Sequence, residues 1–205
     1  MRVMRKGTCG AIGDEAMGKR TPSGCTSGQR VERLPTSSAE RSGAANTYKH
    51  EYFGIQFDLP EGWAFADVSA IASMGGPLAS AAENASIDMV ATSPTTGTSV
   101  VIDIVEPNDT TAGKTAEEVL AAQVQKMTET LEGNFNYTSN DATITFNGLN
   151  REIAANITDL TINDTHLFLC QAVAEKDGVF LYIVTMGTSE EDATNAISHF
   201  KALSE

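Results

Sequence analysis

The sequence is poor in the residue types that build most catalytic and metal centres. Its 205 residues include three cysteines, three histidines and one tryptophan. Cys9, Cys25 and Cys170 show no Cys-x-x-Cys spacing and have no histidine close by, so a zinc site is not supported. No window approaches the roughly 18 uninterrupted apolar residues of a membrane-spanning helix. These shortages favour a protein that acts by binding, and we expect no cofactor and no enzymatic activity.

Basic residues are also scarce, with 14 Lys and Arg against 27 Asp and Glu and a net charge of −13. Residues 1–47 hold eight basic and four acidic residues, 8 − 4 = +4. Residues 48–205 hold the remaining six basic and 23 acidic residues, 6 − 23 = −17. Nucleic-acid binding relies on Lys and Arg that neutralise phosphates, so we expect none for the acidic part. A partner with a basic surface would be attracted to it instead.

This asymmetry predicts two parts, a basic arm over residues 1–47 and a single acidic domain over residues 48–205. The arm is rich in Gly, Ser, Thr and Arg and has no sustained hydrophobic period. It buries too little apolar area to offset its ordering entropy, so we expect it to be mostly disordered. Its positive charge would allow a weak contact with an anionic membrane, or with its own acidic domain.

The arm also carries three short patterns that resemble functional motifs. Met1 to Lys6 is positively charged like the start of a signal peptide, but Gly7 to Ala16 lacks the apolar stretch that should follow. Cys25 ends a segment like a lipoprotein cleavage box, and its lipidation stays open. Gly13 to Lys19 has P-loop spacing, but Arg20 replaces the hydroxyl residue that holds magnesium, so we interpret it as a chance match.

Alternating apolar residues predict strands over much of residues 48–205. Residues 53–59 and 63–65 are expected to form a hairpin around Pro60-Glu61-Gly62. Further strands are expected over 87–92, 98–106, 143–146, 149–158, 160–162, 166–175 and 179–186. Asn147-Gly148, Asn163-Asp164 and Asp177-Gly178 are typical of tight hairpin turns. Residues 179–186 are apolar on both faces, which predicts a central strand.

Two amphipathic helices are expected. Thr115 and Glu118 have the spacing of a capping box, and Gly133 provides a stop. Leu120, Val124, Met127 and Leu131 then form one apolar stripe. Ser189 caps a final helix whose buried stripe includes Ala193, Ile197, Phe200 and either Leu203 or Ala196. An antiparallel sheet covered by amphipathic helices, an α+β sandwich, is the predicted fold class.

The segment from Tyr52 to Trp63, with its Pro-x-Gly-Trp turn, resembles the opening of PsbP/Mog-like domains. The later strand pair, long helix, Phe146-Asn147-Gly148, Lys176-Asp177-Gly178 and closing helix are similar too, so the resemblance spans roughly residues 48–204. It implies an α/β/α sandwich that works by binding or assembly, with no shared catalytic residues. The family includes many bacterial envelope proteins and lipoproteins, which implies an extracytoplasmic location.

One pair of acidic residues suggests a site. If strands 87–92 and 98–106 turn at Thr95-Thr96, paired numbers sum to 191 and Asp88 faces Asp103. Opposed carboxylates are destabilising unless they bind a cation, share a proton or splay into water. We therefore hypothesise a weak calcium or cationic-ligand site at Asp88 and Asp103. The alternatives are a solvated polar face, or a register shifted by a bulge at Gly97.

No other constellation stands out. We interpret His50, His166 and His199 as surface or capping residues, and the five Asn-x-Ser/Thr triplets as chance. The favoured function is a non-catalytic binding or assembly domain at the bacterial cell envelope, with a protein or small-molecule ligand that the sequence does not identify. A carboxylate-dependent hydrolase and a purely structural envelope protein are the alternatives.

Overall fold

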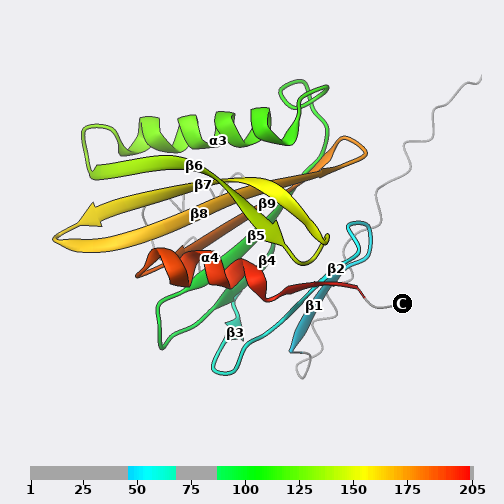
Figure 1. Ribbon diagram of the computed structural model, residues 1–205, viewed down its shortest axis with the longest axis horizontal. Helices are drawn as coiled ribbons and strands as arrows, with labels where there is room; N and C mark the ends of the chain where they lie inside the picture. The colour runs from blue at the N-terminus through cyan, green and yellow to red at the C-terminus, as the bar shows by residue number, and fades with distance from the viewer. Residues whose placement is uncertain (1–45, 68–86, 204–205) are drawn as a thin grey trace, which may run out of the picture. The chain divides into compact units, whose positions relative to one another are not determined.

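The computed structural model describes residues 46–67 and 87–203 (Figure 1). The predictions made for the arm, and for the Ala- and Ser-rich stretch from Val68 to Ser86, fall outside these residues. In chain order the elements are β1 (Thr47–His50), β2 (Ile55–Asp58), β3 (Ala64–Phe65), β4 (Ile87–Thr92), β5 (Ser99–Val105), α3 (Ala116–Leu131), β6 (Asn136–Phe146), β7 (Arg151–Ile162), β8 (Thr165–Lys176), β9 (Val179–Gly187), α4 (Glu190–Ser198) and β10 (Phe200–Ala202).

The strands form two antiparallel sheets. The larger has seven strands in the order β3-β4-β5-β9-β8-β7-β6, and the smaller has the order β1-β2-β10. Strand β9 lies between β5 and β8, which confirms the predicted central position of residues 179–186. The turn residues Asn163, Asp164, Asp177 and Gly178 all have positive φ, as tight hairpins require.

The two helices cover opposite faces of the larger sheet (Figure 1). Val173 and Phe180 pack against α3, whereas their neighbours Ala172 and Leu181 pack in the cluster that contains α4. Successive residues of a strand point to opposite faces, so one set of strands supplies both layers. We call these surfaces the α3 face and the α4 face. This arrangement confirms the predicted α+β sandwich.

Helix α3 begins as the sequence predicts. The Thr115 side chain accepts a hydrogen bond from the Glu118 amide at 3.3 Å, and the Glu118 carboxylate accepts one from the Thr115 amide at 2.9 Å. The reciprocal bonds satisfy two amides of the first turn. Leu120 and Leu131 of the predicted stripe are buried, and Gly133 follows the helix with φ of 77°.

Two predictions about the ends of the domain are wrong. Strand β2 pairs with β1 and β10, and Trp63 and Phe65 do not form a hairpin with it, because β3 pairs with β4 of the other sheet. Phe200 belongs to β10 and not to the last helix, which ends at Ser198. Strand β1 begins at Thr47, the last residue of the predicted arm. The two errors, in the first hairpin and in the last helix, share one cause, since the smaller sheet joins segments about 143 residues apart in the chain.

Aromatic rings join the two sheets. Phe200 lies 4.9 Å from Phe57 and 5.3 Å from Phe146 between ring centroids, and all three are fully buried. At the C-terminal end of β8, the Tyr52 hydroxyl donates to the Lys176 carbonyl at 3.0 Å, and the Lys176 ammonium donates to the Tyr52 carbonyl. The smaller sheet is therefore held against the larger one by packing on the α4 face and by a polar contact.

Candidate functional site

Asp88 and Asp103 do not face each other as predicted. The register sum of 191 holds from Met89 to Thr92, but a bulge between Ile87 and Met89 places Ile87 opposite Asp103. Asp88 is the extra residue of this bulge. The bulge lies at Asp88 and not at Gly97, whose φ of 71° belongs to the turn.

The two carboxyl groups nevertheless influence each other. Burial raises the pKa of Asp103, and the nearby charge of Asp88 raises it further. Asp103 Oδ1 is buried with no hydrogen-bond partner among the described residues. Asp88 accepts a hydrogen bond from the Tyr48 hydroxyl, and burial together with Asp88 raises the pKa of Tyr48. No cluster of three or more His, Cys, Asp or Glu suited to a metal was found in the described part of the chain. The weak cation site remains a prediction.

His50 is buried, which the sequence did not indicate. It is 4% exposed, and its Nδ1 accepts a hydrogen bond from the Phe53 amide at 3.4 Å, so it closes the turn after β1. Burial lowers the pKa of His50, while Asp88 opposes that shift. His199 caps the end of α4 as expected. His166 is exposed and pairs with Asp159 at 2.8 Å.

A buried polar network lies on the α3 face. The Ser139 hydroxyl donates to Asn156 Oδ1 at 2.9 Å, and Asn156 Nδ2 donates to Asp141 at 3.1 Å. Gln171 accepts from the Tyr182 hydroxyl and donates to the sulfur of Met127 on α3. Strand periodicity gives little warning of such groups, because Asn and Gln at inward positions look like surface residues. The contact between Gln171 and Met127 is the one of these that reaches α3 and helps to hold it over the sheet.

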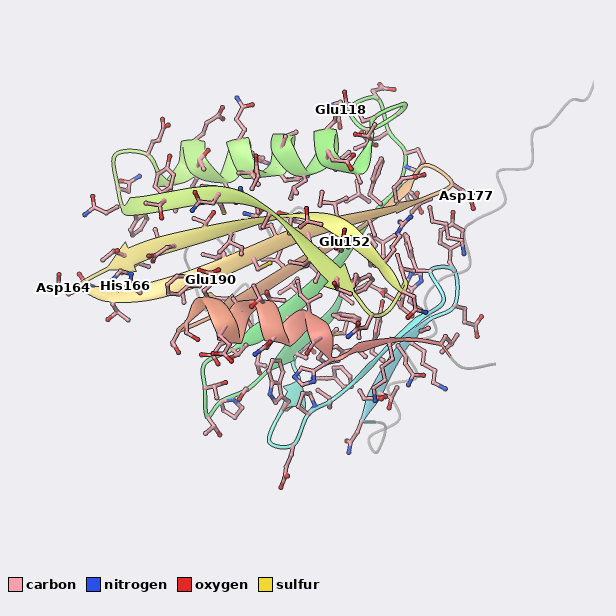
Figure 2. The ribbon with its side chains drawn as sticks, in the orientation of Figure 1. Glu118, Glu152, Asp164, His166, Asp177 and Glu190 are labelled. Carbon is pink, nitrogen blue, oxygen red and sulfur yellow. The ribbon has the colours of Figure 1, made fainter. Side chains whose placement is uncertain are left out.

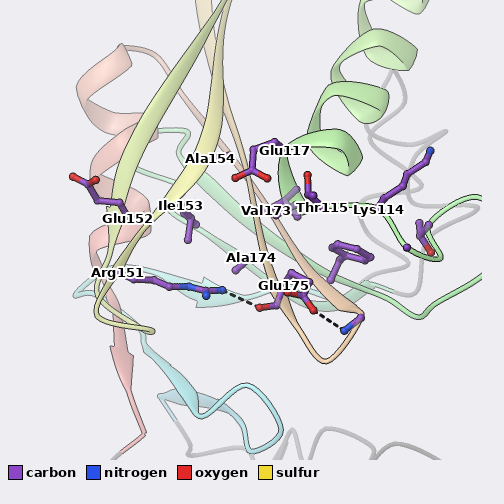
Figure 3. Close-up of a pocket in the computed structure, with 15 residues that line it drawn as sticks. Lys114, Thr115, Glu117, Arg151, Glu152, Ile153, Ala154, Val173, Ala174 and Glu175 are labelled. Atoms are coloured by element: carbon purple, nitrogen blue, oxygen red, sulfur yellow. Dashed lines mark hydrogen bonds between the residues drawn. The ribbon is translucent and has the colours of Figure 1, made fainter.

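A pocket of about 510 Å³ opens where α3 begins (Figure 3). Its floor is apolar and comes from β7, β8 and β9, with Ile153, Val173, Ala174 and Phe180 buried. Its rim carries five charged side chains, which come from the loop before α3, the first turn of α3, β7 and β8. They are Lys114, Glu117, Arg151, Glu152 and Glu175.

The rim charges are held in place by local contacts. Arg151 Nη2 donates to the Glu175 carbonyl at 2.9 Å, which Figure 3 shows as a link across the pocket. Glu175 Oε1 accepts from the Gly178 amide at 2.6 Å. The backbone amide of Glu117 and the Thr115 hydroxyl lower the pKa of Glu117. The pocket thus combines apolar and polar lining residues with charged side chains of both signs at its rim.

Acidic side chains are spread widely around this unit. Figure 2 shows Asp164 and Asp177 at opposite ends of β8, and Glu118, Glu152 and Glu190 on other elements. Cys170 is fully buried, and burial raises the pKa of its thiol to about 12. It therefore acts as a small hydrophobic residue, as predicted. No helix in the described ranges is long and apolar enough to cross a bilayer.

The architecture defines the class, which is an α+β sandwich with a PsbP/Mog-like fold. The solution structure of cyanobacterial PsbP (CyanoP) from Synechocystis sp. PCC 6803 matches with a TM-score of 0.50 and 17% identity, over 82% of this chain and 99% of that one. The Saccharomyces cerevisiae Ran-binding protein Mog1p matches with a TM-score of 0.43 and 12% identity, over 77% of this chain and 94% of that one.

The likeness to CyanoP confirms the predicted fold resemblance. No protein-family model matches the chain, and no curated protein matches it by sequence. At such identities the comparison establishes the fold, and function has to be argued from the residues of this chain.

Proposed function

We propose that this protein is a non-catalytic binding or assembly domain that engages a protein partner with a basic surface. The pocket at the start of α3 is the observation that carries the proposal. Its floor, which includes Ile153, Val173 and Phe180, is closely packed and apolar, and the charged side chains on its rim would orient a partner. Binding sites commonly combine an apolar surface with a few placed polar groups.

The charge of the domain supports the choice of partner. Residues 48–205 carry six basic and 23 acidic residues, a net of −17. Such a field accelerates encounter with a basic surface and is screened by salt. A small cationic ligand is the second occupant that the same charges favour.

The acids near the pocket argue for binding over hydrolysis. A general acid at neutral pH needs a raised pKa, but the pKa of Glu117 on the rim is lowered. The carboxyl with a raised pKa, Asp103, does not line this pocket. Among the three acids that line the pocket, Glu117, Glu152 and Glu175, Glu117 is therefore disfavoured as a general acid.

The location at the bacterial cell envelope is part of the proposal and rests on the sequence resemblance alone. The basic arm of residues 1–47 would then contribute a weak contact with an anionic membrane surface. The Asp88 and Asp103 pair stays a candidate for a weakly held cation, supported by the buried Asp103 oxygen.

The test is affinity capture with the full-length protein from the source organism, followed by titration of the captured partner at several salt concentrations. Glu152→Lys reverses a rim charge, and Glu61→Lys makes the same charge change in the exposed turn after β2. We expect Glu152→Lys to weaken binding by about tenfold and Glu61→Lys to change it by less than about twofold. Equal effects of the two variants, or binding that ignores salt, would contradict the proposal.

A further inference from the structure

One border of the seven-stranded sheet is a long and regular strand. Strand β6 spans 11 residues, and all of them pair in unbroken register with β7, from Asn136↔Thr161 to Phe146↔Arg151. Figure 1 shows it beside β7. The opposite border, β3, has only two residues. The two borders of one sheet thus differ sharply in the length of backbone they present.

Strand β6 lacks the usual protection of a sheet edge. Within residues 46–67 and 87–203, no strand pairs with its outer side. Its sequence, NYTSNDATITF, contains no lysine and no proline, and its pairing shows no bulge. Exposed edges generally carry one of these features, because a row of unpaired amide and carbonyl groups is a template for another strand.

We propose that the outer edge of β6 binds an extended segment of a partner protein, which adds an eighth strand to the sheet. The inference rests on the proposed function for the basic character of that partner. Backbone hydrogen bonds supply affinity in this mode, and alternate side chains supply specificity. Eleven residues give an edge about 35 Å long, since an antiparallel strand rises roughly 3.4 Å per residue.

The two faces of β6 specify the side chains of the incoming segment. Ala142 and Ile144 are half-buried against the core of the α4 face, so an apolar residue beside them extends that core. Asp141 is exposed on the α3 face. A basic residue fits beside it. The segment therefore alternates apolar and basic residues.

The charge of the edge disfavours a second copy of this chain. One strand further in, β7 places Asp159 opposite Thr138 and Glu152 opposite Thr145. Two copies would bring these acids, Asp141 and a net −17 on each domain towards one another. Like charges across paired strands are destabilising, whereas a basic strand is attracted.

The probe is a synthetic nine-residue peptide of alternating valine and lysine, added to the full-length protein. Two matched peptides keep its length, one with glutamate for lysine and one with alternate amides N-methylated along a single edge. We expect the lysine peptide to bind and to slow hydrogen exchange at amides of Asn136–Phe146. The N-methylated peptide has the same charge but lacks the donors, so we expect binding weaker by about tenfold or more.

Two protein variants separate edge pairing from general attraction. Thr143→Lys adds a charge on exposed β6, and Thr95→Lys adds the same charge in the exposed β4–β5 turn. We expect Thr143→Lys to weaken peptide binding by about tenfold and Thr95→Lys by no more than about twofold. Circular dichroism of both variants checks that the fold is retained.

Four outcomes would overturn the inference: no binding of the lysine peptide, equal binding of the N-methylated peptide, slowed exchange away from β6, or a dimer in sedimentation that already protects β6. The last result would assign the edge to a second copy. A captured partner that is lost in Glu152→Lys but leaves β6 unprotected would support the proposed function while overturning this inference.

Discussion

The two faces of the large sheet are built from the same strands but bury different kinds of residue. On the α4 face, Phe57, Phe146, Phe200 and Ile183 are fully buried and packed together. The α3 face carries buried polar groups, including Asn156, Thr158 and Gln171, as well as the pocket. The larger apolar cluster thus lies on the α4 face, whereas the α3 face combines smaller apolar clusters with polar and charged groups.

Replacing Phe200 by alanine should have the largest effect. The ring joins β10 to Phe57 of β2 and Phe146 of β6, and its removal leaves a cavity at the junction of the two sheets. We expect a loss of about 3–5 kcal/mol in the free energy of unfolding, measured by urea denaturation. Phe200→Leu, which keeps most of the volume, should cost clearly less. Equal losses would show that the junction does not depend on the ring.

The approach of β9 to α4 gives the next largest effect. A Cβ atom on Gly187 would lie 2.8 Å from the Ala193 nitrogen and 2.8 Å from Asp192 Cβ. Gly187→Ala should therefore destabilise the protein by about 1–3 kcal/mol through overpacking. Gly133→Ala meets no atom within 4 Å and serves as a comparison in which only the positive φ is strained. A thermal-melting comparison of the two variants separates crowding from backbone strain.

Removal of each helix cap compares the stability of α3 with that of α4. Thr115→Ala removes the capping box of α3, and Ser189→Ala removes the bond to the Asp192 amide at the start of α4. Each substitution should cost about 1 kcal/mol. Hydrogen exchange should show α3 opening more readily in the first variant. If both variants lost protection from exchange only in α4, the expectation that each cap stabilises its own helix would be wrong.

The smallest expected effect concerns pH, where the shifted pKa values of Asp103 and Asp58 should act with opposite sign. The pKa of Asp103 is raised, mainly by burial and also by Asp88, so the folded protein holds this proton more tightly than the unfolded chain. Stability should therefore fall as pH rises from the ordinary value of Asp towards the raised one. Asp103→Asn should remove that decline in urea titrations between about pH 4 and pH 8.

Asp58 provides the opposite control. Burial alone would raise its pKa, but hydrogen bonds from Lys201 and Thr47 outweigh that and lower it. Its contribution to stability is present above the ordinary pKa of Asp and is lost as pH falls. Asp58→Asn should thus flatten the acid side of the profile. Identical profiles for the two variants would refute the assignment of these shifts.

Local signals predicted much of the fold. The capping box at Thr115, the turns at Asn163-Asp164 and Asp177-Gly178, and the apolar run of β9 each act within a few residues. Such features depend on nearby backbone bonds and are visible without knowledge of the tertiary structure. The alternation of apolar residues also indicated the antiparallel sheet between two helices.

The features that the sequence did not predict depend on contacts between separate segments of the chain. The pairing of β2 with β10 cannot be inferred from either segment, since each is a short apolar run that fits several partners. The bulge at Asp88 shifts the register by one residue, so Asp88 is not opposite Asp103 as an unbroken register would place it. His50 looked like a surface residue because burial of its ring depends on contacts with Tyr48 and Phe53. The pocket combines residues from four segments, which no linear motif records.

The position of β10 has a consequence for how the chain folds during its synthesis. Strand β2 leaves the ribosome about 143 residues before its partner strand, Phe200–Ala202. Until then Ile55 and Phe57 lack the cover that buries them in the finished protein. The nascent chain therefore carries an open strand edge and exposed aromatic surface while the residues between β2 and β10 are synthesised. Such surfaces are the ones that chaperones recognise and that aggregate at high concentration.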